Sequence, residues 1–445
     1  MQRCYSWSWV EAQVAQTIAV WDASAGPSTI DGPRHSLKQQ QAREKAFDQA
    51  LRAVELEVKK APRSRIERLE TQDRIIASFA RFSAVALDLQ PEAVKLLTED
   101  FLPAGMELAQ WARQFDANLS PVDMIQAVRN TWTACGLQLL LGDQVGITSS
   151  ILGYSLLYPY TDNYLDREDL SVGAKLRFSE RFQGRLRGDN LTVRNDREAL
   201  IWPLVALIEA QYPRARYPQV FDCLLAIHRA QEKSIAQLKG FGNLDDAEVL
   251  RVSCAKGGTS VLADACLAHG WLNEEESRFS FEWGVLLQLC DDLQDVHDDL
   301  QHSSVTLFSR AAALGGPLDG LVMQLLNFSE RVGARMDNLP DATEMLKELL
   351  RMSWRSLILG AIADAQEFCT PAFLEEVERF SPFRFPFLRA RHQKITRQSS
   401  LNAILFDAFI EAREANHGEL PPPDCRKSFG VEADTEPIAG MRATG

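Results

Sequence analysis

The chain has 445 residues, 46% of them hydrophobic, which is enough for a sizeable core in one large domain or two. Its formal net charge of −13, with no basic block, argues against nucleic acid as a partner. Scattered cysteines without C-x-x-C spacing and the absence of a run of about 18 apolar residues predict a reduced cytoplasmic protein without a membrane span. Peripheral contact with a membrane stays open.

Residues 1–36 look loosely structured, and helical patterns begin near residue 43. Segments 45–60 and 74–89 place apolar residues at steps of three and four, as amphipathic helices do. An apolar stretch covers 134–160 and a basic stretch covers 177–189. Further helical patterns span 200–239, 249–269, 275–300, 318–336, 342–366 and 398–415.

Convincing period-two strands and internal repeats are missing from the sequence. The tail 418–445 is polar and rich in Pro and Gly, so we expect it to be disordered. These patterns predict an all-α protein with a single large helical domain over residues 37–417.

Five aspartates crowd into nine positions of LLQLCDDLQDVHDDL, residues 286–300. On a helix, Asp291, Asp295 and Asp299 share one face, and Asp292 lies slightly around the cylinder. Like charges about 6 Å apart destabilise a helix unless a cation lies between them. Oxygen ligands without histidine or thiolate suit Mg²⁺, which prefers to share its coordination with phosphate. A solvated helix end is the alternative explanation.

A second acidic pair, Asp162 and Asp166, also lies four residues apart and follows an apolar segment, with Asn163 beside the first aspartate. Alone, such a pair is more often a helix cap or a surface pair than a ligand set. Two apolar helices that each end in such a pair are a stronger signal. If the helices face each other in a bundle, the carboxylates can converge to bind cations, which in turn bind an anion.

The two acidic segments resemble motifs of a known family. Residues 284–295 are similar to the second aspartate-rich motif of trans-isoprenyl diphosphate synthases, and 162–166 resemble a reduced form of the first. Residues 253–265 resemble the segment that carries their diphosphate-binding lysine, here Lys256. Residues 298–311 resemble the stretch that follows the second motif. Together these segments cover about 150 residues in the order of the family.

Asp291, Asp295 and Asp299 also match the spacing of the three metal ligands in class I terpene cyclases. The chain therefore resembles the class I isoprenoid synthase superfamily. The resemblance implies a helical bundle with an active-site cavity in its core, Mg²⁺ as cofactor with Mn²⁺ as a substitute, and a prenyl diphosphate as substrate. Homodimers are common among the resembling proteins, which leaves a homodimer open here.

The candidate site residues follow from the motifs and the resemblance. Lys256 is expected to bind diphosphate, and Gly257 and Gly258 after it are expected to interrupt the helix, although an ordinary solvated lysine is the alternative. The candidate metal ligands are Asp162, Asn163, Asp166, Asp291, Asp292, Asp295 and Asp299. The candidate catalytic residues are Asp162, Asp166, Asp291, Asp295 and Lys256.

Further candidates for substrate binding are Gln288, Tyr158, Arg177 and Arg181. Gln288 lies one turn before Asp291, and Tyr158 lies one turn before Asp162 if the helix continues through Pro159. Arg177 and Arg181 belong to a stripe of arginines, continued by Arg185, for which a solvated face is the alternative.

These features favour a terpene synthase that ionises one allylic prenyl diphosphate. Asn163 stands where the synthases have aspartate, and no Gly-Lys-x-x-Arg-Pro segment for isopentenyl diphosphate occurs. A divergent trans-prenyltransferase that elongates or joins prenyl chains is the first alternative. A non-catalytic partner of a prenyl synthase is the second.

Overall fold

The computed structural model describes residues 5–26, 30, 32–60, 64–167, 170–234 and 245–397. Within these residues the regular elements are helices and no β-strand occurs, which confirms the predicted all-α class. The helices in chain order are α1 (Trp7–Ala23), α2 (Leu37–Lys59), α3 (Arg65–Ala86), α4 (Pro91–Lys95), the π-helical turn η1 (Leu96–Phe101), α5 (Leu102–Phe115), α6 (Pro121–Leu140), α7 (Ser149–Asp166), α8 (Val172–Arg187), α9 (Asp196–Gln211), α10 (Pro218–Ser234), α11 (Asp246–His269), α12 (Glu274–Gln294), α13 (Val296–His302), α14 (Leu307–Ala313), α15 (Asp319–Arg335), the 3₁₀ turn η3 (Met336–Asn338), α16 (Glu344–Asp364), the 3₁₀ turn η4 (Gln366–Phe368), α17 (Pro371–Glu378) and α18 (Phe385–Arg397).

Helices α11 and α12 run antiparallel and approach each other most closely at glycines. A Cβ atom added to Gly257 would come within 2.5 Å of the Gly284 carbonyl oxygen, and one added to Gly258 would strike the ring of Phe281. Glycine permits such backbone contact because it carries no side chain. We expected Gly257 and Gly258 to interrupt the helix at Lys256, but α11 continues through both. The two glycines serve the helix crossing instead.

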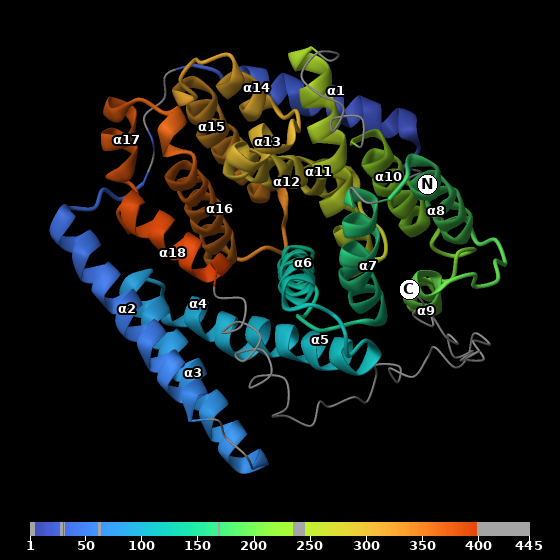
Figure 1. The fold of residues 1–445 in the computed structure, drawn as a ribbon, viewed down its shortest axis with the longest axis horizontal. Coiled ribbons are helices and arrows are strands. Elements are labelled where there is room, and N and C mark those ends of the chain that lie inside the picture. Colours follow the sequence, from blue (N-terminus) through green and yellow to red (C-terminus); the bar gives the residue numbers. More distant parts are fainter. Residues whose placement is uncertain are drawn as a thin grey trace, which may run out of the picture.

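The other helices pack around this central pair. Helices α6, α7 and α10 contact α11, while α1, α15 and α16 contact α12. Helix α9 packs on the outer side of α7, where Gly153 lies against the Leu204 carbonyl oxygen. In Figure 1, α6 is seen nearly end-on at the centre, with α7 to its right and α12 and α13 above it.

Helices α2 and α3 form an antiparallel hairpin at the edge of the molecule (Figure 1). The ring of Phe47 in α2 contacts the rings of Phe82 in α3 and Phe387 in α18. Glu44 also forms an ion pair with Arg384, the residue that precedes α18. Aromatic packing and this ion pair thus hold the hairpin against the C-terminal part of the described chain.

The N-terminal segment differs from the expectation. Residues 1–36 were expected to be loosely structured, but Trp7–Ala23 form helix α1, which lies against α11, α12 and α15. Its inward side buries Val10, Val14 and Trp21. These residues are four and seven positions apart, the spacing of residues on one face of a helix. Apolar residues on the other sides of the helix obscure that signal in the sequence.

Two predictions fall outside the described residues: the helix over 398–415 and the disordered tail over 418–445. Among the helices that the structure describes, none combines the length and apolar character needed to cross a bilayer.

The glycine crossing generates a stability prediction. Gly284→Ala should lower the free energy of unfolding by about 1–3 kcal/mol, because its methyl group would press on the backbone of α11 at Gly257. Gly360→Ala in α16 is the matched control, since a Cβ there meets nothing within 4 Å and alanine favours the helix by about 0.5–1 kcal/mol. Urea unfolding of both variants measures the difference. Equal effects would contradict the close crossing.

Candidate active site

The second acidic segment lies at the C-terminal end of α12 and in α13. Residues 275–300 were predicted to form one helix, but α12 ends at Gln294 and α13 begins at Val296. Backbone bonds still continue across the junction: the Asp295 N–H donates to the Asp291 carbonyl at 2.9 Å, and the Asp299 N–H donates to the Asp295 carbonyl at 2.8 Å. These three aspartates therefore remain neighbours at successive turns.

Asp292 points into the protein. Its side chain is buried, and its two carboxylate oxygens accept hydrogen bonds of 2.8 Å from Ser253 Oγ in α11 and from Gln288 Nε2 one turn earlier in α12. Burial raises the pKa of Asp292 to about 7. Asp292, expected to bind metal, thus joins α12 to α11 through Ser253, while Gln288, expected to bind substrate, donates to Asp292 within α12.

The remaining carboxylates of the segment are desolvated and repel one another. Burial raises the pKa of Asp295 to about 6, and the charges of Asp291 and Asp299 add to that rise. Burial likewise raises the pKa of Asp299 to about 6, although Thr306 Oγ1 donates a hydrogen bond of 3.0 Å to it. A bound cation would relieve this repulsion.

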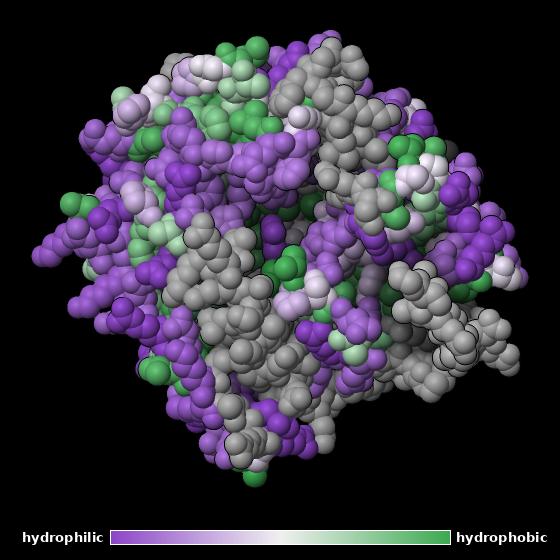
Figure 2. Space-filling view, in the orientation of Figure 1, coloured by the Kyte–Doolittle hydropathy of each residue, from purple (hydrophilic) through white to green (hydrophobic). Residues whose placement is uncertain are grey.

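Asp291 combines desolvation with access to solvent. Burial by the surrounding protein raises its pKa, yet its side chain is 54% exposed. A carboxylate that is accessible but largely surrounded lies in a concave part of the surface. Figure 2 shows a hollow near the centre of this face, in the region between the positions of α6 and α12 in Figure 1.

Helix α7 carries the first acidic pair. It continues through Pro159 to Asp166, so Tyr158 lies one turn before Asp162, as expected. Asp162 is buried, and its Oδ1 accepts a hydrogen bond of 3.0 Å from Gln231 Nε2 of α10. The side chain of Asp166 is outside the described residues.

The two acidic motifs converge on Tyr158. The negative charge of Asp162 raises the pKa of this phenol, burial adds to the rise, and the charge of Asp291 contributes as well. Asp162 in α7 and Asp291 in α12 are thus both near the same hydroxyl, although they are 129 residues apart in the sequence. The charges of both carboxylates therefore act on this hydroxyl.

Asn163 turns away from this place. It is exposed, and its Nδ2 donates hydrogen bonds to Asp123 at 2.6 Å and to Gln126 at 3.4 Å, both in α6. It lines a separate surface pocket of about 350 Å³ together with Arg197 and other residues. This position argues against the metal contact that we expected for Asn163.

Two cationic side chains lie beside the acidic segment. The charge of Lys256 opposes the rise in pKa of both Asp291 and Asp299, which places its ammonium group near these two carboxylates. Arg129 of α6 approaches Asp291, with 3.9 Å between Nη2 and Oδ1. The structure thus surrounds Asp291 with positive charge from two helices.

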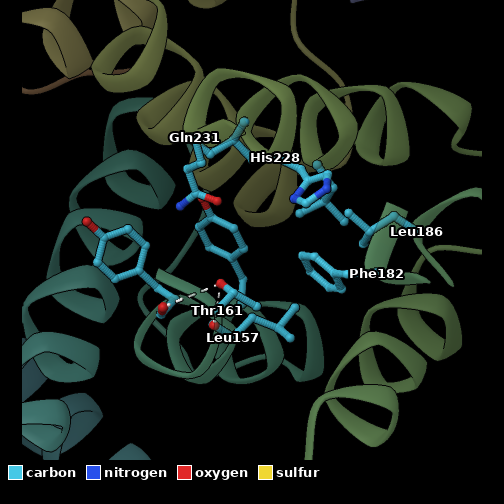
Figure 3. A pocket seen from close by; sticks show the side chains of 10 residues that line it. Leu157, Thr161, Phe182, Leu186, His228 and Gln231 are labelled. Carbon is cyan, nitrogen blue, oxygen red and sulfur yellow. Dashed lines mark hydrogen bonds between the residues drawn. The ribbon is translucent and has the colours of Figure 1, made fainter. Parts of the chain in front are cut away.

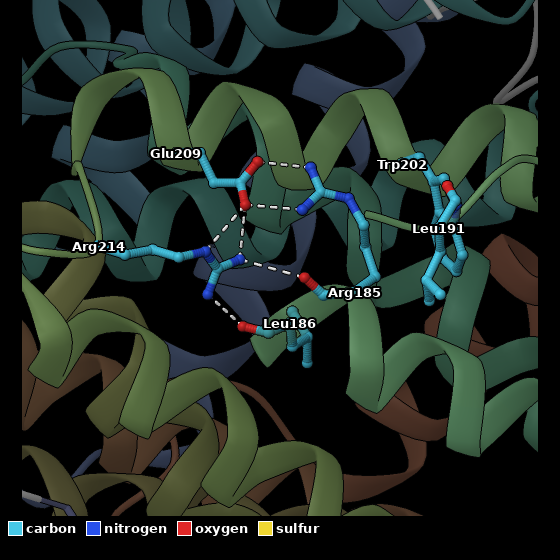
Figure 4. Close-up of polar contacts among 6 residues, drawn as sticks. All are labelled: Arg185, Leu186, Leu191, Trp202, Glu209 and Arg214. Carbon is cyan, nitrogen blue, oxygen red and sulfur yellow. Dashed lines mark hydrogen bonds and ion pairs between the residues drawn. The ribbon is translucent and has the colours of Figure 1, made fainter. Parts of the chain in front are cut away.

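The arginine stripe of α8 mostly pairs with carboxylates of its own region. Arg181 forms two hydrogen bonds to the buried Glu198 of α9, at 2.6 and 2.7 Å. Arg185 pairs with Glu209, which also binds Arg214 (Figure 4). Because Arg181 already pairs with Glu198, its position argues against the phosphate contact that we expected for it. Arg177 is an exposed residue of α8.

A small cavity is lined by residues of α7, α8 and α10 (Figure 3). Its volume is about 20 Å³, and it is lined by Tyr154, Leu157, Tyr158, Thr161, Phe182, Leu186, Leu224, Ile227, His228 and Gln231. A cavity of this size holds about one water molecule. It is far smaller than the core cavity that the resemblance implies.

The types of ligand in this region suit magnesium, but their positions in this structure do not form a metal site. Carboxylate oxygens are its preferred protein ligands, and desolvated carboxylates that repel one another favour a cation. Among the side chains that the structure describes, no three Asp, Glu, His or Cys residues lie close enough together to hold a metal ion. Binding would require these carboxylates to move closer together.

Comparison with known proteins does not assign the chain. No model of a protein family matches it, and no curated protein matches it.

Sequence reasoning missed several residues of the site. Gln231, Ser253 and Arg129 were not singled out, because each contacts an aspartate that is distant in the sequence. Arg129 alone gave a signal, since it is a charged residue within a largely apolar helix. Partners on other helices become evident only from the packing.

The contrast between neighbouring aspartates gives a second prediction. Asp292→Ala should lower the free energy of unfolding by about 1–3 kcal/mol, because Ser253 and Gln288 lose their buried acceptor. Asp291→Ala should change it by less than about 0.5 kcal/mol, since its side chain is half exposed. Chemical denaturation at neutral pH in metal-free buffer measures both. A larger loss for Asp291→Ala would reverse the assignment.

Proposed function

We propose that this protein is a magnesium-dependent class I terpene synthase that ionises an allylic prenyl diphosphate, with Mn²⁺ as a substitute metal. The observation that supports the proposal is the mixed charge around Asp291, which lies 3.9 Å from Arg129, together with the action of both Asp162 and Asp291 on the Tyr158 hydroxyl. Lys256 and Arg129 lie next to the second motif. An all-α bundle with acidic and basic groups near the end of α12 suits a substrate that carries several negative charges.

The chemistry requires separation of charge as the allylic C–O bond breaks. Magnesium, when bound through the aspartates, stabilises the negative charge that develops on the departing diphosphate. Lys256 and Arg129 hold the same group by direct charge attraction. The face of Tyr158 and the apolar residues below it provide surroundings that stabilise a carbocation and exclude bulk water.

The size of the cavity defines the second candidate function. At about 20 Å³, it cannot hold a prenyl chain unless its lining side chains rotate away. A non-catalytic partner of a prenyl synthase would not need such space, nor a metal site that is already assembled. A divergent trans-prenyltransferase needs the space and a second substrate as well.

Turnover assays test the proposal directly. The purified protein with Mg²⁺ should release inorganic diphosphate from farnesyl or geranylgeranyl diphosphate and form a terpene that gas chromatography with mass spectrometry detects. Asp162→Ala and Asp291→Ala should each reduce this release by at least about a hundredfold, the scale of losing an electrostatic catalytic group. Asp298→Ala, an exposed acidic neighbour, is the matched control and should retain activity.

Other outcomes identify the alternatives. An elongated diphosphate that forms only when isopentenyl diphosphate is added indicates a prenyltransferase. If no substrate is consumed, and Mg²⁺ with diphosphate leaves the melting temperature unchanged, the non-catalytic partner is favoured and the terpene synthase is excluded.

Removal of Lys256 separates diphosphate binding from stability. Lys256→Ala should weaken inhibition by inorganic diphosphate by about 1–3 kcal/mol, the range for a hydrogen bond to a charged group.

Arg181→Ala is the contrast: it should destabilise the fold by about 3–5 kcal/mol, because it leaves Glu198 buried without its cation. It should leave the inhibition constant unchanged at temperatures where the variant stays folded. Weaker inhibition in Arg181→Ala alone would reassign the anion site to α8.

A further inference from the structure

The small cavity adjoins the place where the proposed reaction would begin. Gln231 and Tyr158 both line the cavity, and both also contact Asp162. Its volume of about 20 Å³ exceeds the space of one water molecule by little. Thr161, His228 and the hydroxyl of Tyr154 are further polar groups of a lining whose other members are apolar (Figure 3). A water molecule in such a space needs at least two polar partners, which this lining supplies.

His228 presents a hydrogen-bond acceptor in this region. Its Nε2 lies 3.0 Å from Ser179 Oγ, 3.2 Å from the Ser179 carbonyl oxygen and 3.8 Å from Glu232 Oε1. A carbonyl and a carboxylate accept hydrogen bonds, so Nε2 carries the proton and Nδ1 carries the lone pair. Within the described part of the chain, the buried Nδ1 has no hydrogen-bond partner.

The surroundings keep this imidazole neutral in the resting protein. His228 is 1% exposed. Its ring lies perpendicular to the ring of Phe182, with 5.1 Å between the ring centres. Burial lowers the pKa of His228, while the charge of Glu232 opposes this effect. Glu232 itself is 34% exposed, so the ring lies between the cavity and a carboxylate that solvent reaches.

From this geometry we infer that His228 Nδ1 holds one water molecule in the cavity, and that this water captures the carbocation, so that the product is a terpene alcohol. The inference rests on the proposed function and adds the class of product and the residue that determines it. A buried acceptor beside a water-sized cavity carries it.

The capture step adds one water to the cation and releases one proton. A lone pair of the water oxygen forms the new C–O bond to the cationic carbon, and one O–H bond of that water breaks. The proton passes to Nδ1, which leaves a neutral alcohol and an imidazolium ring. Glu232, 3.8 Å from Nε2, stabilises the imidazolium charge. Loss of the Nδ1 proton to solvent as the product leaves restores the neutral ring with its lone pair on Nδ1.

Isotope labelling and a crystal structure test the inference. Turnover in water enriched in oxygen-18 should give an alcohol that carries the label. Wild-type protein that releases diphosphate but forms hydrocarbons alone would overturn the inference while leaving the proposed function intact. If the wild type consumes no prenyl diphosphate, the proposed function and the capture step fail together. A crystal structure then decides the water site by itself: density for a water within hydrogen-bond distance of His228 Nδ1 supports it, and its absence overturns it.

Variants of His228 assign the effect to Nδ1. The amide of His228→Asn falls where Nδ1 lies and can still hold the water, whereas the amide of His228→Gln falls nearer Nε2. We expect His228→Gln and His228→Leu to lower the alcohol share of the products at least tenfold, and His228→Asn to retain most of it. His269→Leu is the control for loss of a histidine elsewhere, since His269 pairs with Asp143.

The product ratio is measured at equal diphosphate release, so that a general loss of activity does not affect it. An alcohol share that is unchanged in His228→Gln and His228→Leu would overturn the assignment. Equal losses in His228→Asn and His228→Gln would do so as well. If His228→Leu does not fold, the two amide variants decide.

Discussion

The candidate site depends on the close approach of α11 and α12 at Gly257 and Gly284. This contact fixes how the two helices are aligned along their length. It places Ser253, one turn before Gly257, opposite Asp292. It also places Lys256 near Asp291. A larger residue at either glycine would separate the backbones and change every one of these distances. The arrangement of charges thus follows from a packing contact that carries no charge.

Charge repulsion acts against stability at the same place. The protein around Asp291, Asp295 and Asp299 raises the pKa of each carboxyl, and the charges of Asp291 and Asp299 add to the rise at Asp295. Lys256 and Arg129 offset part of this cost. Proteins tolerate local destabilisation of this kind mostly where function requires it. The charge repulsion at the end of α12 is therefore consistent with a site for a cation and an anion.

The sequence predicted the elements better than the contacts between them. The helical class and the helical spacing of the aspartates follow from periodicity, which is a local property. The inward turn of Asp292, the pairing of Arg181 with Glu198 and the outward turn of Asn163 depend on partners from other helices. The order of residues cannot reveal such partners. The glycines after Lys256 show the same limit, because helix breaking and helix crossing require the same residue type.

The junction at Asp295 separates the acidic segment into two parts with different supports. Asp291 belongs to the long helix α12, while Asp299 belongs to α13 and is held by Thr306, which caps the start of α14. The separation between the first and last carboxylates is therefore not a property of one rigid helix. A substitution of Thr306 would therefore remove a hydrogen bond that positions Asp299 without altering any aspartate.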